Sequence, residues 1–372
     1  MNEDNDQREQ RILRVIVAGG GTGGHLFPGL AVADALAKRR PCRIVFVGAS
    51  RGIETRVVGK RGFPLRTLPV RALRGQGPLG LATSALRLPA SLVSAWRLVD
   101  ELRPELLIGV GGYASAPAVV AGWARRIPTV LLEQNAHPGL TNRLLARFAD
   151  RVCVAFPESA PYFPSGRTIE TGNPVRPPVS QPAERRPEGF SILIFGGSAG
   201  AHRLNEIGVE AMERLAGPAP RARIVHQTGE ADFAWVRARY RERSIEADVR
   251  PFIDDMAAAY AGADLVVCRA GATTLAELTA LGKPAVLVPY PYAADDHQRK
   301  NAQSLVGRGA AMMILDRELS AENLSQAIGE LRAQPERLAA MATAASALGR
   351  PDAAERVVDV CLNLVRDRQR GS

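Results

Sequence analysis

Two glycine-rich segments of the chain each follow a short apolar run and each precede a helical stretch. The first, Gly19–Gly24, reads GGGTGG, and the second, Gly196–Gly200, reads GGSAG. A strand that breaks into glycines and continues as a helix directs several backbone N–H groups at one point on the positive end of the helix dipole, which favours phosphate. Two such turns, one in each half of the chain, predict an enzyme that handles two phosphorylated substrates.

The first glycine segment matches the dinucleotide-binding pattern GxGxxG, but the pattern is incomplete. A nicotinamide enzyme also needs an acidic residue at the end of the second strand to bind the ribose, and here Val47–Arg51 reads VGASR. His25 directly follows the glycines. It either caps and packs against the turn or serves as a general base beside a bound phosphate, and both interpretations stay open.

Two more segments of the first half are expected on the same rim of its sheet. Gly111–Tyr113 follows a strand with two glycines, and Glu133–Asn135 places three polar residues directly after an apolar strand. The carboxyl ends of parallel strands meet at one edge, where ligands of open α/β sheets bind. A tight turn would explain the glycines alone, but the polar run favours a site.

Ser198 lies in a GxSxG pattern, which is also that of a serine hydrolase nucleophile. That chemistry needs an acid and then a histidine later in the chain, for which Asp255 or Glu277 and then His297 are the candidates. The pattern is short and common in glycine turns, so a serine hydrolase is an alternative and not the main hypothesis.

The segment Cys268–Glu277 combines an apolar strand, a glycine turn and a helix that opens with small hydroxyl residues. Backbone N–H groups and hydroxyls suit phosphate, and Glu277 suits a sugar diol because a carboxylate accepts two O–H hydrogen bonds. Ordinary helix capping is the simpler alternative. Further on, Asp295–Gln298 adds a polar cluster, but no second ligand pair at helical spacing supports a metal site.

Apolar runs of strand length alternate with helical stretches in both halves, which predicts two parallel sheets with helices on both faces. Predicted strands cover residues 13–18, 43–47, 106–110, 129–132 and 152–155, then 192–195, 223–226, 248–252, 265–268 and 285–288. Predicted helices cover residues 26–39, 86–102, 116–125 and 141–148, then 321–332, 335–347 and 352–368. Between the halves, Gly172–Pro187 contains five prolines in sixteen residues and predicts a stiff linker.

Composition and charge predict a cytoplasmic globular protein with anionic ligands. Of the 372 residues, 46% are apolar and 23% charged, and the four cysteines are scattered as reduced thiols would be. No apolar run reaches the ~18 residues that span a bilayer. The net charge of +10 favours phosphorylated substrates, nucleic acid or acidic lipid. With 5% aromatic residues and no helix-turn-helix pattern, nucleic acid is not expected, and the arginines of Arg237–Arg243 are interpreted as a solvated helix face.

Eight segments spread over the chain resemble the bacterial N-acetylglucosaminyltransferases of peptidoglycan synthesis, the MurG type. They read GGGTGGHLFPGLAVA, GVGGYASAP, LEQNAHPGLTN, TGNPVRP, IFGGSAGA, FIDDMAAAYAGADLVVCRAGATTLAEL, GKPAVLVPYPYAADDHQRKNA and PDAAERV. Enzymes of this family transfer N-acetylglucosamine from UDP-N-acetylglucosamine to lipid I, the undecaprenyl-pyrophosphoryl-muramyl-pentapeptide, and so make lipid II. Ala199 departs from the family pattern, which commonly has glutamine at this position beside the phosphate loop.

The resemblance implies the GT-B architecture, an α/β fold of two doubly wound Rossmann-like domains facing across a cleft. Residues 11–175 would form the N-terminal acceptor domain, which faces the membrane and on which the closing helix 351–368 would pack. Residues 176–189 would be the proline-rich linker, and residues 190–345 the UDP-sugar domain.

Matching positions imply the site residues of this chain. UDP-N-acetylglucosamine would be held by Thr22, Gly23, Gly24, Asn135, Arg176, Ser198, Ile253, Gln298 and the turn Ala272, Thr273, Thr274, Leu275, Ala276 and Glu277. Ile253 would meet the uracil through its backbone, and Glu277 would bind the ribose hydroxyls. The acceptor pyrophosphate would lie on Gly20, Gly21, Gly111, Gly112 and Tyr113. Neither a cofactor nor a metal ion is expected.

The expected reaction is inverting transfer by direct displacement, in which the muramyl 4-hydroxyl attacks the anomeric carbon and UDP leaves. The helix N-termini near Ser198 and Ala272 would stabilise the leaving charge in place of a metal. His25 is the first candidate for the general base and Glu133 the second. A UDP-sugar 2-epimerase or another GT-B transferase is the nearest alternative.

The resemblance also implies a peripheral protein on the cytoplasmic face of the inner membrane, active in cell-wall synthesis, cell shape and cell division. Between Arg71 and Arg97 the chain interleaves leucines with arginines and has no acidic residue. Leu79 and Leu81 are expected on a glycine-interrupted loop that enters anionic headgroups, although part of the stretch must be core helix.

Overall fold

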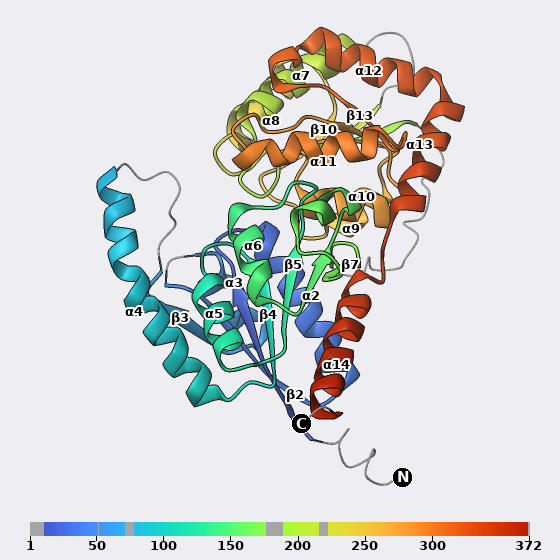
Figure 1. Cartoon of the computed structure of the whole chain (residues 1–372). Coiled ribbons are helices and arrows are strands. Elements are labelled where there is room, and N and C mark those ends of the chain that lie inside the picture. The colour runs from blue at the N-terminus through green and yellow to red at the C-terminus, as the bar shows by residue number, and fades with distance from the viewer. Residues whose placement is uncertain (1–10, 51, 71–77, 176–188, 216–221, 371–372) are drawn as a thin grey trace. The chain divides into compact units, whose positions relative to one another are not determined.

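The computed structural model describes residues 11–50, 52–70, 78–175, 189–215 and 222–370, with the backbone alone for 78–88 (Figure 1). The chain divides into two compact units. Unit 1 comprises Met1–Arg176 with Pro351–Ser372, and unit 2 comprises Pro177–Arg350. Each unit has its own parallel sheet and its own hydrophobic core.

Unit 1 contains a seven-stranded parallel sheet in the order β3-β2-β1-β4-β5-β6-β7. Its strands are β1 (Leu13–Gly19), β2 (Cys42–Ala49), β3 (Leu65–Leu68), β4 (Leu106–Gly111), β5 (Thr129–Glu133), β6 (Arg151–Val154) and β7 (Thr168–Glu170). Its helices are α2 (Gly23–Arg39), α3 (Glu54–Val57), α4 (Pro78–Leu102), α5 (Ala116–Ala124), α6 (Leu140–Leu145) and α14 (Ala353–Arg370). The strand order reverses between β1 and β4, and such a switch point is where ligands of this fold bind.

Helices cover both faces of the unit 1 sheet because its central strands are apolar on both sides. On one face, Leu30 of α2 belongs to the same core as Val357 and Cys361 of α14. The two helices pack side by side (Figure 1), and Arg39 forms a 3.0 Å ion pair with Asp359. The last helix of the chain therefore completes the core of the first unit.

Unit 2 contains a six-stranded parallel sheet in the order β10-β9-β8-β11-β12-β13. Its strands are β8 (Ser191–Phe195), β9 (Arg223–Gln227), β10 (Ala247–Arg250), β11 (Leu265–Cys268), β12 (Ala285–Leu287) and β13 (Ala311–Met313). Its helices are α7 (His202–Leu215), α8 (Phe233–Glu242), α9 (Met256–Ala261), α10 (Ala272–Ala280), α11 (His297–Val306), α12 (Ala321–Ala333) and α13 (Pro335–Leu348). Here the order reverses between β8 and β11, which makes a second switch point.

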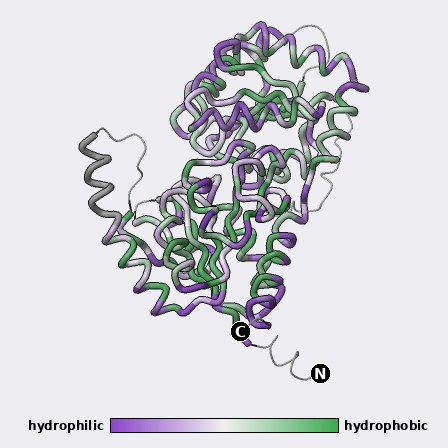
Figure 2. Tube along the Cα trace, in the orientation of Figure 1, coloured by the Kyte–Doolittle hydropathy of each residue, from purple (hydrophilic) through white to green (hydrophobic). Residues whose placement is uncertain are grey.

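The hydropathy of the residues agrees with an arrangement of central sheets covered by helices. Figure 2 shows hydrophobic residues along the central strands of both units and hydrophilic residues along the outer helices. In unit 2, Leu193, Ile194 and Val267 are fully buried in the sheet. Ser320 begins α12 with a side-chain cap, because its hydroxyl oxygen accepts the N–H of Asn323.

The predicted fold class of two doubly wound α/β domains is confirmed, and every strand predicted from the sequence is present. Three strands were missed, namely β3, β7 and β13. Each has only three or four residues, lies at the edge of its sheet and carries partly exposed side chains, so it lacks a buried-strand pattern. The last helix, predicted over residues 352–368, is present as α14, which begins at Ala353 and ends at Arg370.

The membrane segment expected between Arg71 and Arg97 is only partly described. Residues 71–77 lie outside the described part of the chain, and α4 begins at Pro78, eight residues earlier than predicted. Leu79 and Leu81 therefore belong to a helix and not to a loop, which corrects that prediction, while their side chains lie outside the described residues. Within the described ranges, no helix is both long enough and apolar enough to cross a membrane.

Candidate active site

The two glycine segments of unit 1 meet at its switch point. A Cβ atom added to Gly19 would lie 2.4 Å from the carbonyl oxygen of Gly111, and one added to Gly112 would lie 2.6 Å from the carbonyl oxygen of Gly20. Real Cβ atoms do not come so close, so the two turns can touch only because both are glycine. The ring of Tyr113 lies beside Gly21. The predicted convergence of these segments on one rim is therefore present in the structure.

His25 lies at this junction. It is the third residue of α2, and its Nδ1 lies 3.0 Å from the hydroxyl oxygen of Thr22, the N-cap residue. The imidazole faces the other turn, since a Cβ on Gly111 would lie 2.8 Å from His25 Cδ2. A base at Nε2 requires the tautomer in which Nδ1–H donates to Thr22 Oγ1. Gly23 and Gly24 form the first turn of the same helix.

Glu133 ends β5 with a carboxylate that is buried and surrounded by donors. Oε1 accepts the backbone N–H of Asn135 at 2.9 Å and its side-chain amide at 3.2 Å, and Oε2 accepts the side-chain amide of Asn142 at 2.9 Å. Burial raises the pKa of Glu133, while the hydrogen bonds from Asn135, Asn142 and Gly139 lower it. Both carboxylate oxygens are thus used to hold neighbouring amides, and Asn142 in turn lies against Gly111.

The glycine turn of unit 2 follows β8 at the second switch point. The N–H of Gly200 donates to the carbonyl of Gly197 at 3.1 Å, and Ser198 is exposed at the tip of the turn. Gln227, at the end of β9, links this turn to Ile253: its amide donates to the Gly197 carbonyl at 3.0 Å, and its Oε1 accepts the Ile253 N–H at 2.8 Å. The Ile253 N–H is therefore engaged within the protein.

Sequence reasoning missed Gln227, although one signal was available. It is a polar residue at the carboxyl end of an apolar strand, the same signal that singled out Glu133.

The turn before α10 brings together several of the predicted donor-binding residues. Oε1 of Gln298 accepts the N–H of Ala270 at 3.1 Å and the N–H of Tyr290 at 3.0 Å. These two bonds fix the carbonyl end of the Gln298 amide, so its NH₂ group points away from them. The hydroxyl of Thr273, in the first turn of α10, is buried without a hydrogen-bond partner among the described residues. A donor and a hydroxyl are thus present where a phosphate or sugar could use them.

Glu277 lies in the second turn of α10 and is half-buried. Its Oε2 accepts a 2.8 Å hydrogen bond from the hydroxyl of Tyr260, whose ring is buried against Phe195. Burial, and then the negative charge of Glu277, raise the pKa of Tyr260, so the phenol remains a hydrogen-bond donor. Tyr260 was also missed by the sequence analysis, because a tyrosine in an alanine-rich helix carries no spacing signal.

The serine hydrolase alternative requires a triad that the structure does not assemble. Nδ1 of His297 is paired with the carbonyl of Ala294 at 2.6 Å, and Asp255 accepts the N–H of Ala258 as the cap of α9. In the described part of the chain, no hydrogen bond joins Ser198 to a histidine. Ser198 is therefore placed as a turn residue and not as an activated nucleophile.

Arg176 lies outside the described residues, so the structure gives no position for this predicted contact.

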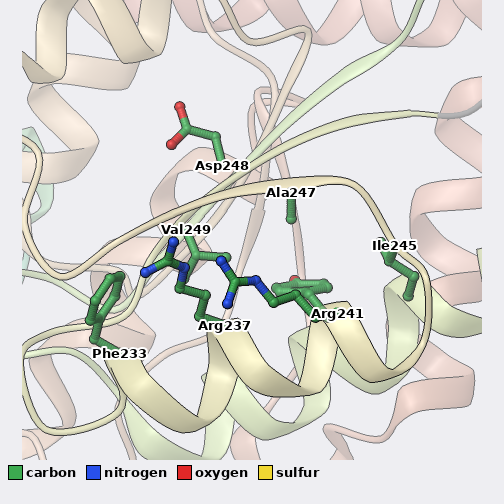
Figure 3. Close-up of a pocket in the computed structure, with 8 residues that line it drawn as sticks. Phe233, Arg237, Arg241, Ile245, Ala247, Asp248 and Val249 are labelled. Carbon is green, nitrogen blue, oxygen red and sulfur yellow. The ribbon is translucent and has the colours of Figure 1, made fainter.

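A cavity of about 400 Å³ in unit 2 lies apart from all of these residues, between α8 and β10 (Figure 3). Arg237 and Arg241 project from α8 toward the strand on one side of it. The other two arginines of this helix region form ion pairs, Arg239 with Glu242 and Arg243 with Glu213. The arginine run is an exposed helix face, as predicted.

Two family models match the chain, the glycosyltransferase family 28 N-terminal domain over residues 15–154 and the glycosyltransferase family 28 C-terminal domain over residues 191–357. A curated protein of Anaeromyxobacter sp. (strain K), named UDP-N-acetylglucosamine--N-acetylmuramyl-(pentapeptide) pyrophosphoryl-undecaprenol N-acetylglucosamine transferase, is 50% identical over 361 residues, which cover 96% of this chain and 94% of that protein. Among solved structures, MurG of Acinetobacter baumannii is 34% identical with a TM-score of 0.80, covering 94% of this chain and 99% of its own. UDP-GlcNAc 2-epimerase of Neisseria meningitidis, solved with UDP-GlcNAc, is 14% identical with a TM-score of 0.66, covering 95% of this chain and 100% of its own, and shares the fold alone.

Proposed function

The chain belongs to glycosyltransferase family 28, and we propose that it transfers N-acetylglucosamine from UDP-N-acetylglucosamine to the muramyl 4-hydroxyl of lipid I, giving lipid II for peptidoglycan synthesis. The observation that carries the proposal is the near-complete match to a relative with that named activity. The matched ranges include both switch-point turns and the segments that follow them. The 2-epimerase alternative rests on fold likeness alone.

The donor site that we propose in unit 2 uses groups from both sides of the second switch point. Glu277 accepts hydrogen bonds from the two ribose hydroxyls, and the carbonyl of Ile253 meets the uracil. Ser198 and Thr273 lie on turns that open helices α7 and α10, where backbone N–H groups and the helix dipoles stabilise phosphate charge. The NH₂ group of Gln298, fixed through its Oε1, donates to the sugar or the diphosphate.

The acceptor chemistry that we propose belongs to unit 1. His25 removes the proton of the muramyl 4-hydroxyl as its oxygen attacks the anomeric carbon, and the bond from that carbon to the UDP oxygen breaks. UDP leaves with the bonding electron pair, and its charge is stabilised by the preorganised N–H groups of unit 2. Glu133 is assigned a positioning role through Asn135 and Asn142, because both of its carboxylate oxygens are already occupied.

Acceptor-dependent UDP release is the assay that tests the proposed function. Release from UDP-N-acetylglucosamine should require a lipid-linked muramyl pyrophosphate and should stop without it. A 2-epimerase would instead form UDP-N-acetylmannosamine without any acceptor, and a serine hydrolase would be inactivated by a fluorophosphonate.

Replacing Tyr260 with phenylalanine should weaken UDP binding about two- to tenfold, the equivalent of roughly 0.5–1.5 kcal/mol for one hydrogen bond. The change removes the phenol that fixes Oε2 of Glu277. Tyr240→Phe is the matched control, since Tyr240 is equally buried in unit 2 and its hydroxyl pairs with His226 Nδ1 at 3.0 Å. Calorimetry with UDP and with 2′,3′-dideoxy-UDP provides the comparison. An equal loss for both ligands would show that Tyr260 does not act through the ribose.

We also propose that unit 1 docks on an anionic membrane surface, since lipid I is a membrane substrate. Exposed apolar side chains lie on the adjacent helices α4 and α5, with Val93 51%, Trp96 39% and Trp123 52% exposed. The guanidinium of Arg125 lies 4.4 Å from the Trp96 ring centroid, and Arg97 is exposed on α4. Apolar side chains among arginines suit an anionic headgroup layer.

Trp96→Glu combined with Trp123→Glu should weaken binding to phosphatidylglycerol vesicles about 30-fold, because each charge near an anionic surface contributes about 1 kcal/mol. Tyr292→Glu in unit 2 is the control, because Tyr292 is 83% exposed but belongs to the other unit. Vesicle flotation at low and high salt measures the binding. The double variant Leu79→Glu with Leu81→Glu, in the first turn of α4, is tested in the same assay. Equal flotation with neutral and anionic vesicles would contradict the proposal.

A further inference from the structure

Glu54 is a fully buried carboxylate next to the turn that leads into His25. It is the first residue of α3 and has 0% exposed surface. Its Oε2 accepts the backbone N–H of Gly21 at 3.0 Å, and its Oε1 accepts the backbone N–H of Ala49 at 2.9 Å. No lysine or arginine among the described residues forms an ion pair with it. Backbone donors therefore compensate for the burial of this group.

Three glycines make the space that this carboxylate fills. A Cβ atom on Gly20 would lie 2.9 Å from Glu54 Cδ, one on Gly48 would lie 2.7 Å from Glu54 Cγ, and one on Gly52 would lie 2.2 Å from Glu54 Oε2. These glycines come from the turn after β1, from β2 and from the connection to α3. Side chains at any of the three positions would displace Glu54.

The hydrogen bond from the Gly21 N–H to Glu54 fixes the turn immediately before α2, the helix that carries His25. Gly21 precedes Thr22, which is the N-cap of α2 and whose hydroxyl oxygen lies 3.0 Å from His25 Nδ1. Displacing Gly21 would therefore move Thr22, and with it the partner that orients the imidazole. The negative carboxylate behind the Gly21 amide also disfavours a phosphate at that N–H.

We propose that Glu54 is a positioning residue that holds the Gly19–Thr22 turn so that His25 is oriented for proton transfer. The inference rests on the proposed function, in which His25 is the general base. It also revises the role of Gly21, whose N–H is bonded to Glu54 and serves to orient His25 instead of binding the acceptor pyrophosphate.

Glu54→Gln tests this proposal directly. The N–H groups of Gly21 and Ala49 donate to different oxygens of the Glu54 carboxylate, whereas a glutamine side chain has a single oxygen that can accept. The amide NH₂ would then face either Gly21 or Ala49. We expect kcat to fall about 10- to 100-fold, because a small misplacement of a catalytic group has an effect of this size. The Kd for UDP should stay within about twofold, since the change lies in unit 1.

Gly52→Ala is a second variant that displaces the carboxylate and keeps its charge. The matched control is Gly59→Ala, because a Cβ on Gly59 meets nothing within 4 Å. Glu105→Gln is the control for losing a carboxylate that binds a backbone amide, since Glu105 accepts the Arg14 N–H at 3.2 Å near the opposite end of β1. Only Glu54→Gln and Gly52→Ala should lower kcat, and neither control should.

A double-mutant cycle with His25→Ala separates positioning from a general structural effect. If Glu54 acts through His25, adding Glu54→Gln to His25→Ala should lower kcat no further. Additive losses, unchanged kcat in Glu54→Gln, or an equal loss in Glu105→Gln would overturn the inference. Should His25→Ala alone retain full turnover, the assignment of the base fails, and this positioning role fails with it, while the transferase proposal still stands on acceptor-dependent UDP release.

Discussion

His25→Ala should lower turnover by roughly 10²–10⁴-fold, the usual contribution of a positioned general base. The imidazole lies where the two glycine turns of unit 1 meet, and its Nδ1 pairs with Thr22. Alanine removes the proton acceptor without filling the space near Gly111. The Kd for UDP should remain nearly unchanged, because the proposed donor site lies in unit 2. Steady-state kinetics with a lipid I analogue, together with calorimetry for UDP, measure both quantities.

Two outcomes would change the role of His25. A loss confined to the KM of the acceptor would make it a pyrophosphate ligand, and normal turnover would show that His25 is not the base. His202→Ala is a suitable control, since His202 begins α7 in unit 2 and its Nδ1 pairs with Asp232 at 2.9 Å. This control should retain the wild-type pH profile of kcat.

Glu277→Ala should weaken UDP binding by about 1.5–3 kcal/mol, the contribution of hydrogen bonds to a charged group. The carboxylate is half-buried on α10 and is fixed by Tyr260, so it is oriented before the ribose arrives. Glu277→Gln should lose less, because glutamine keeps an acceptor for the tyrosine hydroxyl. Calorimetry measures the affinity for UDP of the wild type, Glu277→Ala and Glu277→Gln.

The control for this substitution is Glu210→Ala, an exposed glutamate on α7 of the same unit. Its UDP affinity should equal that of the wild type. Unchanged affinity in Glu277→Ala would remove Glu277 from the ribose site. A loss that accompanies a lower melting temperature would instead show that α10 was disturbed.

The fold was largely predictable because each central strand is an apolar run that ends in glycine or polar residues. β8, for example, reads SILIF before Gly196. The edge strands β3, β7 and β13 could not be predicted in this way. A segment such as β7, with the sequence TIE, has no apolar pattern of its own. Its strand conformation comes from pairing with β6, which the sequence does not display.

The candidate site was predictable only where its residues follow strands directly. Glycines after β1, β4, β8 and β11 mark both switch points, since chain reversal at a strand end needs them. Glu54 was not found, because its burial depends on glycines that come together only when β1 pairs with β2. The choice between His25 and Glu133 likewise depends on burial: the sequence shows both as polar residues after strands, and only the structure shows that the Glu133 carboxylate is saturated with donors.

Product analysis tests the central claim most directly. UDP-N-acetylglucosamine and a short-chain lipid I analogue are incubated with the protein, and the product is examined by mass spectrometry and by the proton coupling at its new anomeric carbon. The account predicts one added N-acetylglucosamine per acceptor in the β configuration, with one UDP released for each. An α-linked product, or UDP release without any glycosylated acceptor, would contradict inverting transfer to the muramyl hydroxyl.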